Sequence, residues 1–271
     1  MTSHAWHDQW SDVDRTDPQW FIHFLDASRK RLLEFLRTNA AQYYAGIRSG
    51  MSVLDVGCGT GVMLHSLAGL VGAGGRVVGV DYSSAMVEEA RKRSSGLGLA
   101  LEFRQGDVHH LDFPNDTFDW SMAALLFQHL PAPLPPLREM VRVTKSGGTV
   151  LIAEQDWDTF IIDASDRDVT RRITRHFCDM LPNGWIGRQL PAAMHDAGLA
   201  NIQVNTMQLN LSAEEWSDPA MGFRDIAAQA QKAGAITHAE QTRWEAEIEQ
   251  RLREGRFFAS FTLFRVSATK P

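Results

Sequence analysis

The chain has 271 residues, a hydrophobic content of 44% and a formal net charge of −6 at pH 7. This length can bury a core as one large domain or as a domain with an added cap. The acidic balance argues against a nucleic-acid partner. The sequence contains no run of about 18 apolar residues, so no transmembrane helix is predicted. The N-terminus lacks the features of a signal peptide, so a cytoplasmic protein is expected. The two cysteines are too far apart for a disulfide framework, and no metal site is predicted.

In chain order, residues 1–45 come first and are rich in aromatic side chains, which predicts an N-terminal helical cap or lid. From residue 46 to 271 we predict one domain in which short β-branched runs alternate with helical stretches, as in βαβ units around a parallel sheet. Strands are predicted at 51–56, 76–80, 101–104, 118–123, 149–154, 202–211 and 257–266, and helices at 62–70, 84–95, 134–143 and 191–197.

Two further segments, at about 156–186 and 212–255, interrupt this alternation as helical insertions. The first carries a predicted helix at 166–180, and the second two or three helices. In an open α/β sheet, ligands bind beyond the carboxyl ends of the strands, so segments that leave those ends can wall or cover a site. They can also serve only to bury sheet surface, and the sequence leaves both interpretations open.

The segment VLDVGCGTG, residues 53–61, predicts a strand that runs through a glycine-rich turn into a helix. Glycines let the backbone approach a ligand closely, and a helix N-terminus offers free N–H groups. Such a turn also suits a dinucleotide, but the spacing of Gly57, Gly59 and Gly61 differs from G-x-G-x-x-G. Asp55 would repel a pyrophosphate, and it suits the ammonium group of an amino-acid ligand, directly or through a water.

Two more carboxylates follow the next two predicted strands. Asp81 comes about twenty residues after the glycine turn, where an acid binds ribose hydroxyls in nucleotide-binding α/β folds. It can alternatively cap the following helix. Asp107 can accept a hydrogen bond from an adenine amino group, although an isolated Asp there is more often a turn residue. Together, three acids at the ends of three successive strands favour a ligand that combines an amino acid with a nucleoside.

On these residues the chain resembles the class I S-adenosylmethionine-dependent methyltransferases, in the group that includes the ubiquinone and menaquinone C-methyltransferases. The resemblance rests on residues 53–61, 77–90, 106–130 and 138–154. It implies a Rossmann-like, doubly wound α/β fold with a seven-stranded, mostly parallel sheet whose last strand is antiparallel. It also implies S-adenosyl-L-methionine as cofactor and S-adenosyl-L-homocysteine as product. The cofactor-binding residues that it implies are Asp55, Gly57, Gly59 and Gly61 at the methionine moiety, Asp81 at the ribose, and Tyr82, Met86, Asp107 and Val108 around the adenine.

The acceptor pocket of such an enzyme lies beyond the fourth and fifth strands. His129 follows the fourth strand, where an imidazole can act as a catalytic base, orient an acceptor, or pack under the next helix. Met86 can likewise be a core residue of its helix. The candidate acceptor-binding residues are Trp20, Phe127, Asp156, Trp157 and Trp185, although the acidic stretch around Asp156 can also be a solvated loop.

Methyl transfer requires alignment of the acceptor and exclusion of water, because the cofactor already carries the activation. We expect transfer to a small-molecule acceptor, with O-, N- and C-methylation all open. We expect a monomer or homodimer with no nucleic-acid or membrane partner. The alternative is a cyclase or decarboxylase on the same scaffold, because a fold does not determine a function. The glycine spacing disfavours an NAD-dependent dehydrogenase.

Overall fold

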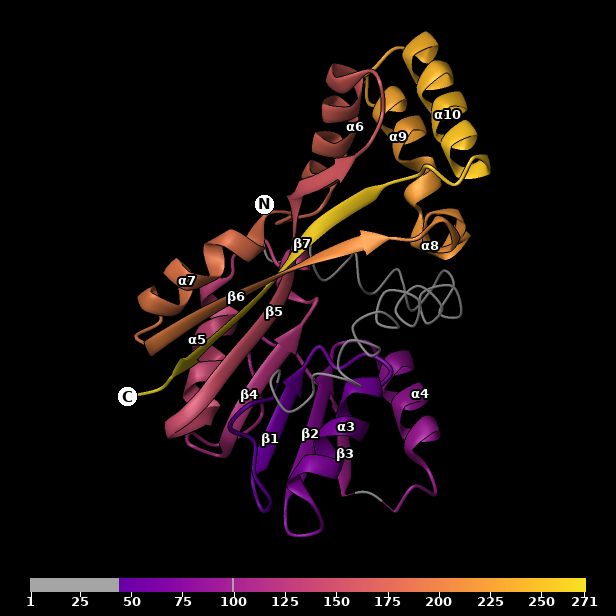
Figure 1. Cartoon of the computed structure of the whole chain (residues 1–271). Coiled ribbons are helices and arrows are strands. Elements are labelled where there is room, and N and C mark those ends of the chain that lie inside the picture. The colour runs from indigo at the N-terminus through magenta and orange to yellow at the C-terminus, as the bar shows by residue number, and fades with distance from the viewer. Residues whose placement is uncertain (1–43, 99) are drawn as a thin grey trace.

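The structure is a computed structural model and describes residues 44–98 and 100–271. Its centre is a seven-stranded sheet with strand order β3-β2-β1-β4-β5-β7-β6 (Figure 1). The strands are β1 (Ser52–Val56), β2 (Arg76–Asp81), β3 (Leu101–Gln105), β4 (Phe118–Ala124), β5 (Thr144–Ile162), β6 (Ala200–Leu211) and β7 (Ala259–Thr269). β1 to β5 pair in parallel, whereas β7 is antiparallel to both β5 and β6. The predicted Rossmann-like fold is therefore confirmed.

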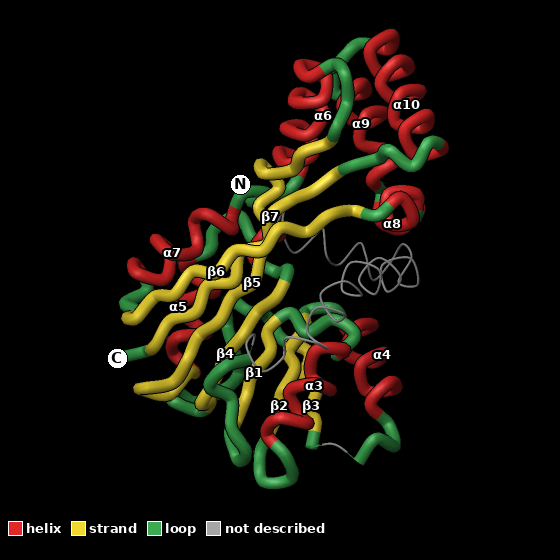
Figure 2. The backbone as a smooth tube through the Cα atoms, viewed as in Figure 1, coloured by secondary structure: helices red, strands yellow, loops and turns green. Residues whose placement is uncertain are grey.

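Helices cover both faces of this sheet (Figure 2). One face packs against α3 (Val62–Val71) and α4 (Ser84–Ser94), and the other against α5 (Leu134–Val143) and α7 (Ile186–Asp196). In β1, Val53 belongs to the first apolar layer and Leu54 to the second, and both are fully buried. Burial on both faces explains why this parallel strand has a continuous apolar sequence.

At one end of the sheet, β5, β6 and β7 continue outward and carry a helical cap (Figure 1). Its helices are α6 (Arg167–Met180), α8 (Ala213–Ser217), α9 (Ile226–Lys232) and α10 (His238–Arg253), with 3-10 turns η2 (Pro219–Met221) and η3 (Phe223–Asp225). Both predicted insertions contribute to one aromatic-rich core, in which Trp157 of β5 packs edge-on against Phe177 of α6 and at a tilt against Phe223. Trp244 Nε1 also donates to Thr170 Oγ1 at 3.0 Å, which joins α10 to α6.

Several element bounds differ from the sequence prediction, and two of these differences lie near the predicted acceptor side. β5 was expected to end at residue 154 but pairs with β7 as far as Ile162, after a bulge that follows Asp156. α7 was expected to begin at residue 191, whereas it begins at Ile186 and contains Pro191. A proline inside a helix removes one hydrogen bond. Ile186, Leu190 and Met194, four residues apart and fully buried, supply the packing that offsets this cost.

Candidate cofactor and acceptor site

The glycine-rich turn takes the backbone shape that only glycine adopts readily. Gly57, Gly59 and Gly61 have φ values of 71°, 53° and 76°, all in the left-handed region. Two of these glycines also lie against neighbouring side chains. A Cβ at Gly61, the N-cap of α3, would stand 2.7 Å from Phe103 Cε1, and one at Gly57 would stand 3.0 Å from Leu126 Cδ1. The sequence therefore builds a tight turn between β1 and α3 that no larger residue fits.

Asp81 connects the end of β2 to this turn. Its Oδ2 accepts the Gly59 N–H at 2.7 Å, and its Oδ1 accepts the Ser83 N–H at 3.0 Å. Ser83 is the N-cap of α4 and accepts the Met86 N–H, so Asp81 does not cap that helix. The carboxylate of Asp81 thus lies beside the glycine turn, which is the placement that a ribose-binding acid requires.

The remaining implied cofactor residues lie at the same edge of the sheet. Asp55 is buried at the carboxyl end of β1, and Asp107 follows β3. Asp107 Oδ1 accepts the backbone N–H of His109 at 2.9 Å and lies 2.8 Å from its Nδ1. Tyr82 is half-buried and Val108 buried, whereas Met86 is buried on α4 as a core residue would be.

These positions test whether the chain can hold S-adenosylmethionine. Carboxylates lie at or just beyond the carboxyl ends of β1, β2 and β3, which are adjacent parallel strands, so all three stand at one edge of the sheet. The glycine turn lies at that edge, where the backbone can approach a ligand. A cationic amino-acid end, a ribose and an adenine each find a suitable partner there, so the residues fit this cofactor.

Beyond β4 the chain forms η1 (Phe127–His129), a short 3-10 turn. Phe127 is fully buried. Burial lowers the pKa of the His129 imidazole to about 4, so this side chain is neutral at pH 7. Within β5, burial raises the pKa of the Glu154 carboxyl to about 8. We did not predict Glu154 as a site residue, although an acid directly after an apolar strand is a visible signal.

The structure places three predicted acceptor-binding residues in different surroundings. Asp156 is fully buried, and its two oxygens accept Nε and Nη2 of Arg188 on α7 at 2.6 and 2.8 Å. Trp157 lies in the aromatic core of the cap and donates from Nε1 to Gln128 Oε1 at 2.8 Å. Trp185 is half-exposed, with the Arg188 guanidinium 5.9 Å from its ring. These contacts hold Asp156 and Trp157 in place, and their role in acceptor binding stays a prediction. Trp20, with nearly all of the 1–45 segment, lies outside the described residues.

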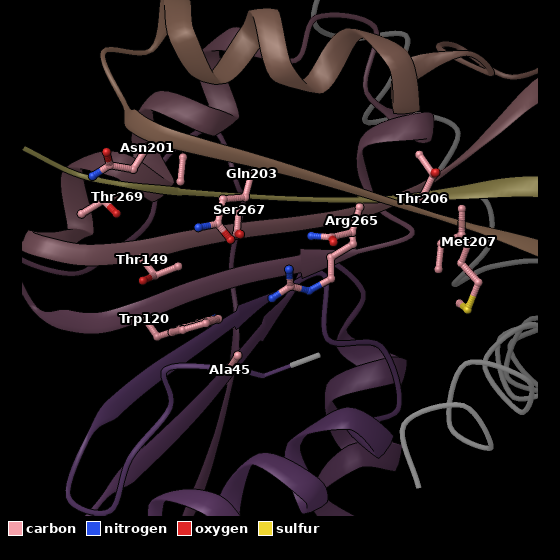
Figure 3. Close-up of a pocket in the computed structure, with 13 residues that line it drawn as sticks. Ala45, Trp120, Thr149, Asn201, Gln203, Thr206, Met207, Arg265, Ser267 and Thr269 are labelled. Atoms are coloured by element: carbon pink, nitrogen blue, oxygen red, sulfur yellow. The ribbon is translucent and has the colours of Figure 1, made fainter. Parts of the chain in front are cut away.

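A separate pocket of about 600 Å³ lies on one face of the outer strands (Figure 3). Polar side chains of β6 and β7 line much of it, including Gln203, Asn205, Arg265 and Ser267. None of the predicted site residues borders it. Within the part of the chain that the structure describes, no three metal-ligating side chains gather, and no helix is long and apolar enough to cross a membrane.

Comparison with known proteins agrees with this geometry. The profile of a family described as "Methyltransferase domain" matches residues 47–211, which include the glycine turn and all three acids. The chain belongs to this family. With residues that fit the cofactor, it is an S-adenosylmethionine-dependent methyltransferase.

The chain is similar in sequence to several other proteins. It is 36% identical over 239 residues to an uncharacterized 37.1 kDa protein of transposon TN4556 from Streptomyces fradiae, covering 85% of this chain and 68% of that one. It is 37% identical over 142 residues to a phosphatidylethanolamine N-methyltransferase of Cereibacter sphaeroides, covering 52% and 66%. It is 35% identical over 116 residues to a demethylmenaquinone methyltransferase of Bacillus cereus, covering 42% of this chain and 49% of the relative.

Solved structures share the fold at low sequence identity. Phosphoethanolamine N-methyltransferase 2 of Haemonchus contortus, solved with S-adenosyl-L-methionine, superposes with a TM-score of 0.60 at 17% identity, covering 97% of this chain and 60% of that one. The cyclase SpnF superposes with a TM-score of 0.52 at 19% identity, covering 88% and 80%. The same fold is thus found in a protein named as a cyclase.

Proposed function

We propose that the protein methylates a small-molecule acceptor bound beyond β4 and β5, next to the cap. The observation that carries this proposal is the direct bonding of the segment after β4 to the cap. Gln128 accepts the Trp157 N–H through its side chain at 2.8 Å and the Asn183 backbone N–H through its carbonyl at 3.0 Å. These bonds join the segment after β4 to the cap at the end of the sheet where we propose that the acceptor binds, which supports a site enclosed by side chains, the kind that takes a small molecule.

The named relatives are consistent with this acceptor class. Their names refer to phosphatidylethanolamine and to demethylmenaquinone, which are both small molecules. One carries an amine and the other a ring, so these names leave N- and C-methylation both open for this chain. O-methylation stays open as well.

The chain contributes binding and orientation to the reaction. S-Adenosylmethionine, when bound, supplies a methyl group already activated by its sulfonium. Asp55 and the glycine turn are proposed to hold the methionine end, Asp81 the ribose, and Tyr82, Asp107 and Val108 the adenine. Two acceptor-side candidates lie in segments at this end of the sheet. Phe127 is in η1, which follows β4, and Trp185 is the N-cap of α7.

His129 is proposed to orient the acceptor rather than to remove its proton. Its imidazole is neutral at pH 7, because burial lowers its pKa to about 4. A base with so low a pKa captures a proton poorly at neutral pH, but its nitrogens still donate or accept a hydrogen bond. An acceptor that must lose a proton would therefore pass it to water or to another group.

The experiment is radiochemical. Purified full-length chain is incubated with S-adenosylmethionine that carries a tritiated methyl group and with fractions of a small-molecule extract. The expected result is a labelled product one methyl group heavier than its precursor, formed together with S-adenosylhomocysteine. Tight calorimetric binding of S-adenosylhomocysteine with no labelled product from any fraction would refute the proposal.

The alternative is a cyclisation or decarboxylation that uses the bound cofactor without consuming it. The fold shared with SpnF keeps this candidate open. Mass spectrometry separates the two, because the alternative converts a substrate without adding a methyl group and without forming S-adenosylhomocysteine.

We also propose that the protein works in the cytoplasm as a monomer or homodimer. Cys58 and Cys178 are both buried thiols, which agrees with a reducing compartment. Cell fractionation tests the location, and light scattering on the purified chain tests the assembly state.

A further inference from the structure

Glu154 is a carboxyl group in a fully buried position at the end of the apolar part of β5. It follows Val150, Leu151, Ile152 and Ala153, and its own side chain has no exposed surface. Its Oε1 accepts the N–H groups of Leu126 and Phe127, both at 2.6 Å. Its Oε2 has no hydrogen-bond partner among the residues that the structure describes. An apolar side chain of similar size would fill this place at a lower desolvation cost. The hydrogen bonds that the carboxyl accepts therefore explain why it is there.

It holds residues 125–130, which we call the η1 segment. Leu125 has a φ of 56°, a left-handed conformation that side-chain-bearing residues adopt uncommonly, and there the chain turns away from β4. The Leu125 N–H still bonds Ala153 O in the sheet at 2.9 Å. The next two N–H groups, at the N-cap Leu126 and at Phe127, the first residue of η1, have left the sheet, and both donate to Glu154. The carboxyl therefore acts as an N-cap supplied from a neighbouring strand.

The η1 segment in turn contacts both halves of the site. On one side Leu126 packs against Gly57 of the cofactor turn, so closely that a Cβ at Gly57 would meet Leu126 Cδ1 at 3.0 Å. On the other side Gln128 bonds to Trp157 and Asn183 at the cap. His129 is the last residue of η1 and follows Gln128 directly. A shift of the segment would therefore disturb the cofactor turn and the acceptor side together.

We propose that Glu154 is a positioning residue of the transferase: through two backbone N–H groups it fixes the η1 segment against the cofactor turn. The part of this proposal that concerns the acceptor rests on the proposed function. The part that concerns the cofactor turn can be tested without knowing the acceptor. Glu154 acts through Leu126 and Phe127, so it need not touch the reacting atoms.

The test compares two substitutions of Glu154 in the full chain by calorimetric binding of S-adenosylhomocysteine. Glu154→Gln keeps an oxygen that can accept both N–H groups, and its affinity is expected to stay within about threefold of wild type. Glu154→Met removes the acceptor at similar volume, and its affinity is expected to fall about tenfold or more, since two buried donors lose their partner. Hydrogen exchange of a peptide covering 125–130 should accelerate in Glu154→Met and not in Glu154→Gln.

Glu247→Met is the matched control. Glu247 also holds a loop through one oxygen, which accepts N–H and Oγ–H of Ser165 at 2.8 Å each, but it lies on α10 in the cap. Its loss should leave S-adenosylhomocysteine affinity within about twofold of wild type, because these hydrogen bonds are remote from the cofactor turn. Glu154→Asp, whose carboxyl is too short to reach both N–H groups, replaces the methionine variant if that variant does not fold.

Wild-type affinity and unchanged exchange in Glu154→Met, or in Glu154→Asp in its place, would overturn the proposal. An equal loss of S-adenosylhomocysteine affinity in Glu154→Gln and in Glu154→Met (or Glu154→Asp), without faster hydrogen exchange at residues 125–130, would overturn it too. The effect on binding would then not act through the η1 segment. If the wild-type chain itself does not bind S-adenosylhomocysteine, the cofactor assignment fails instead. The exchange experiment then still decides whether Glu154 holds the segment.

Discussion

Arg188 and Asp156 form a bidentate ion pair that connects α7 to β5. Nε of Arg188 lies 2.6 Å from Oδ2 of Asp156, and Nη2 lies 2.8 Å from Oδ1. The Arg188 backbone N–H also donates to Oδ2 at 3.2 Å. Asp156 is fully buried while Arg188 stays 40% exposed, so the arginine brings a positive charge from the surface to a carboxylate in the core.

Removal of this arginine should destabilise the fold. In Arg188→Met the buried carboxylate loses its charged partner, at a cost of about 2 kcal/mol, below the range for fully buried pairs because water reaches the arginine. Urea unfolding measures the free energy of unfolding. Arg256→Met, which breaks an exposed pair with Glu254, is the control and should change it by less than about 0.5 kcal/mol. Similar losses in both variants would contradict the structural role of the buried pair.

Gly61→Ala should damage both stability and cofactor binding. The new methyl group would sit 2.7 Å from Phe103 at a residue whose φ is 76°. Backbone strain and crowding together should cost about 2 kcal/mol or more. Gly96→Ala is the matched control, since its φ is 80° but no atom lies within 4 Å of the added carbon. Urea unfolding and S-adenosylhomocysteine calorimetry measure the two effects. Equal stability losses in the two variants would mean that crowding at Phe103 does not matter.

Asp81→Asn should weaken S-adenosylhomocysteine binding. The carboxylate accepts two backbone N–H groups on separate oxygens, and an amide retains only one of these acceptors. We expect an affinity loss of about tenfold or more, because the turn loosens and the charge at the proposed ribose position disappears.

Asp119→Asn is the control for this substitution. Asp119 also accepts a backbone N–H of a neighbouring strand, from Ser52 at 2.8 Å, but at the opposite end of the sheet. Its replacement should lower stability and leave affinity within about twofold of wild type, as expected of a site remote from the ligand. An affinity loss as large in Asp119→Asn as in Asp81→Asn would argue against a local role for Asp81.

The stability of the protein should depend on pH through Glu154. Its folded pKa, about 8, lies above the ordinary value of 4.5, so folding favours the protonated form. The stabilisation is therefore complete below about pH 4.5 and is lost as pH rises through 8. Relative to Glu154→Gln, the wild-type free energy of unfolding should fall by at most about 1.4 kcal/mol per pH unit in that window. Parallel urea-derived curves for the two proteins between pH 5 and 8.5 would contradict this.

The cofactor half of the site could be predicted because its signals are local. Gly57, Gly59 and Gly61 lie within one turn, and each acid lies within two residues of the end of its own strand. The alternation of strand and helix then brings these positions to one edge of the sheet, whatever the details of packing. For this reason the order of the elements and the parallel part of the sheet were predicted from the pattern, and the antiparallel last strand from the family resemblance.

The acceptor half could not be predicted in the same way, because its contacts join distant positions. Asp156 looks like a solvated acid until Arg188, thirty-two residues later, is known to lie against it. Glu154 gains its role only from the N–H groups of Leu126 and Phe127, twenty-eight and twenty-seven residues earlier. Trp157 is an inviting stacking surface in sequence but lies in an aromatic core that two separate insertions complete.

Leu211 and Ala259 are paired residues of β6 and β7, so the segment between them leaves the sheet and re-enters it at the same rung of the ladder. Whatever is placed between these two residues does not alter the strand register below them. The helices α8 to α10 are therefore attached to the sheet at one point of its rim, and they share the aromatic core of the cap with α6. The register of the strands that carry the methyl-donor site does not depend on the length or sequence of this insertion.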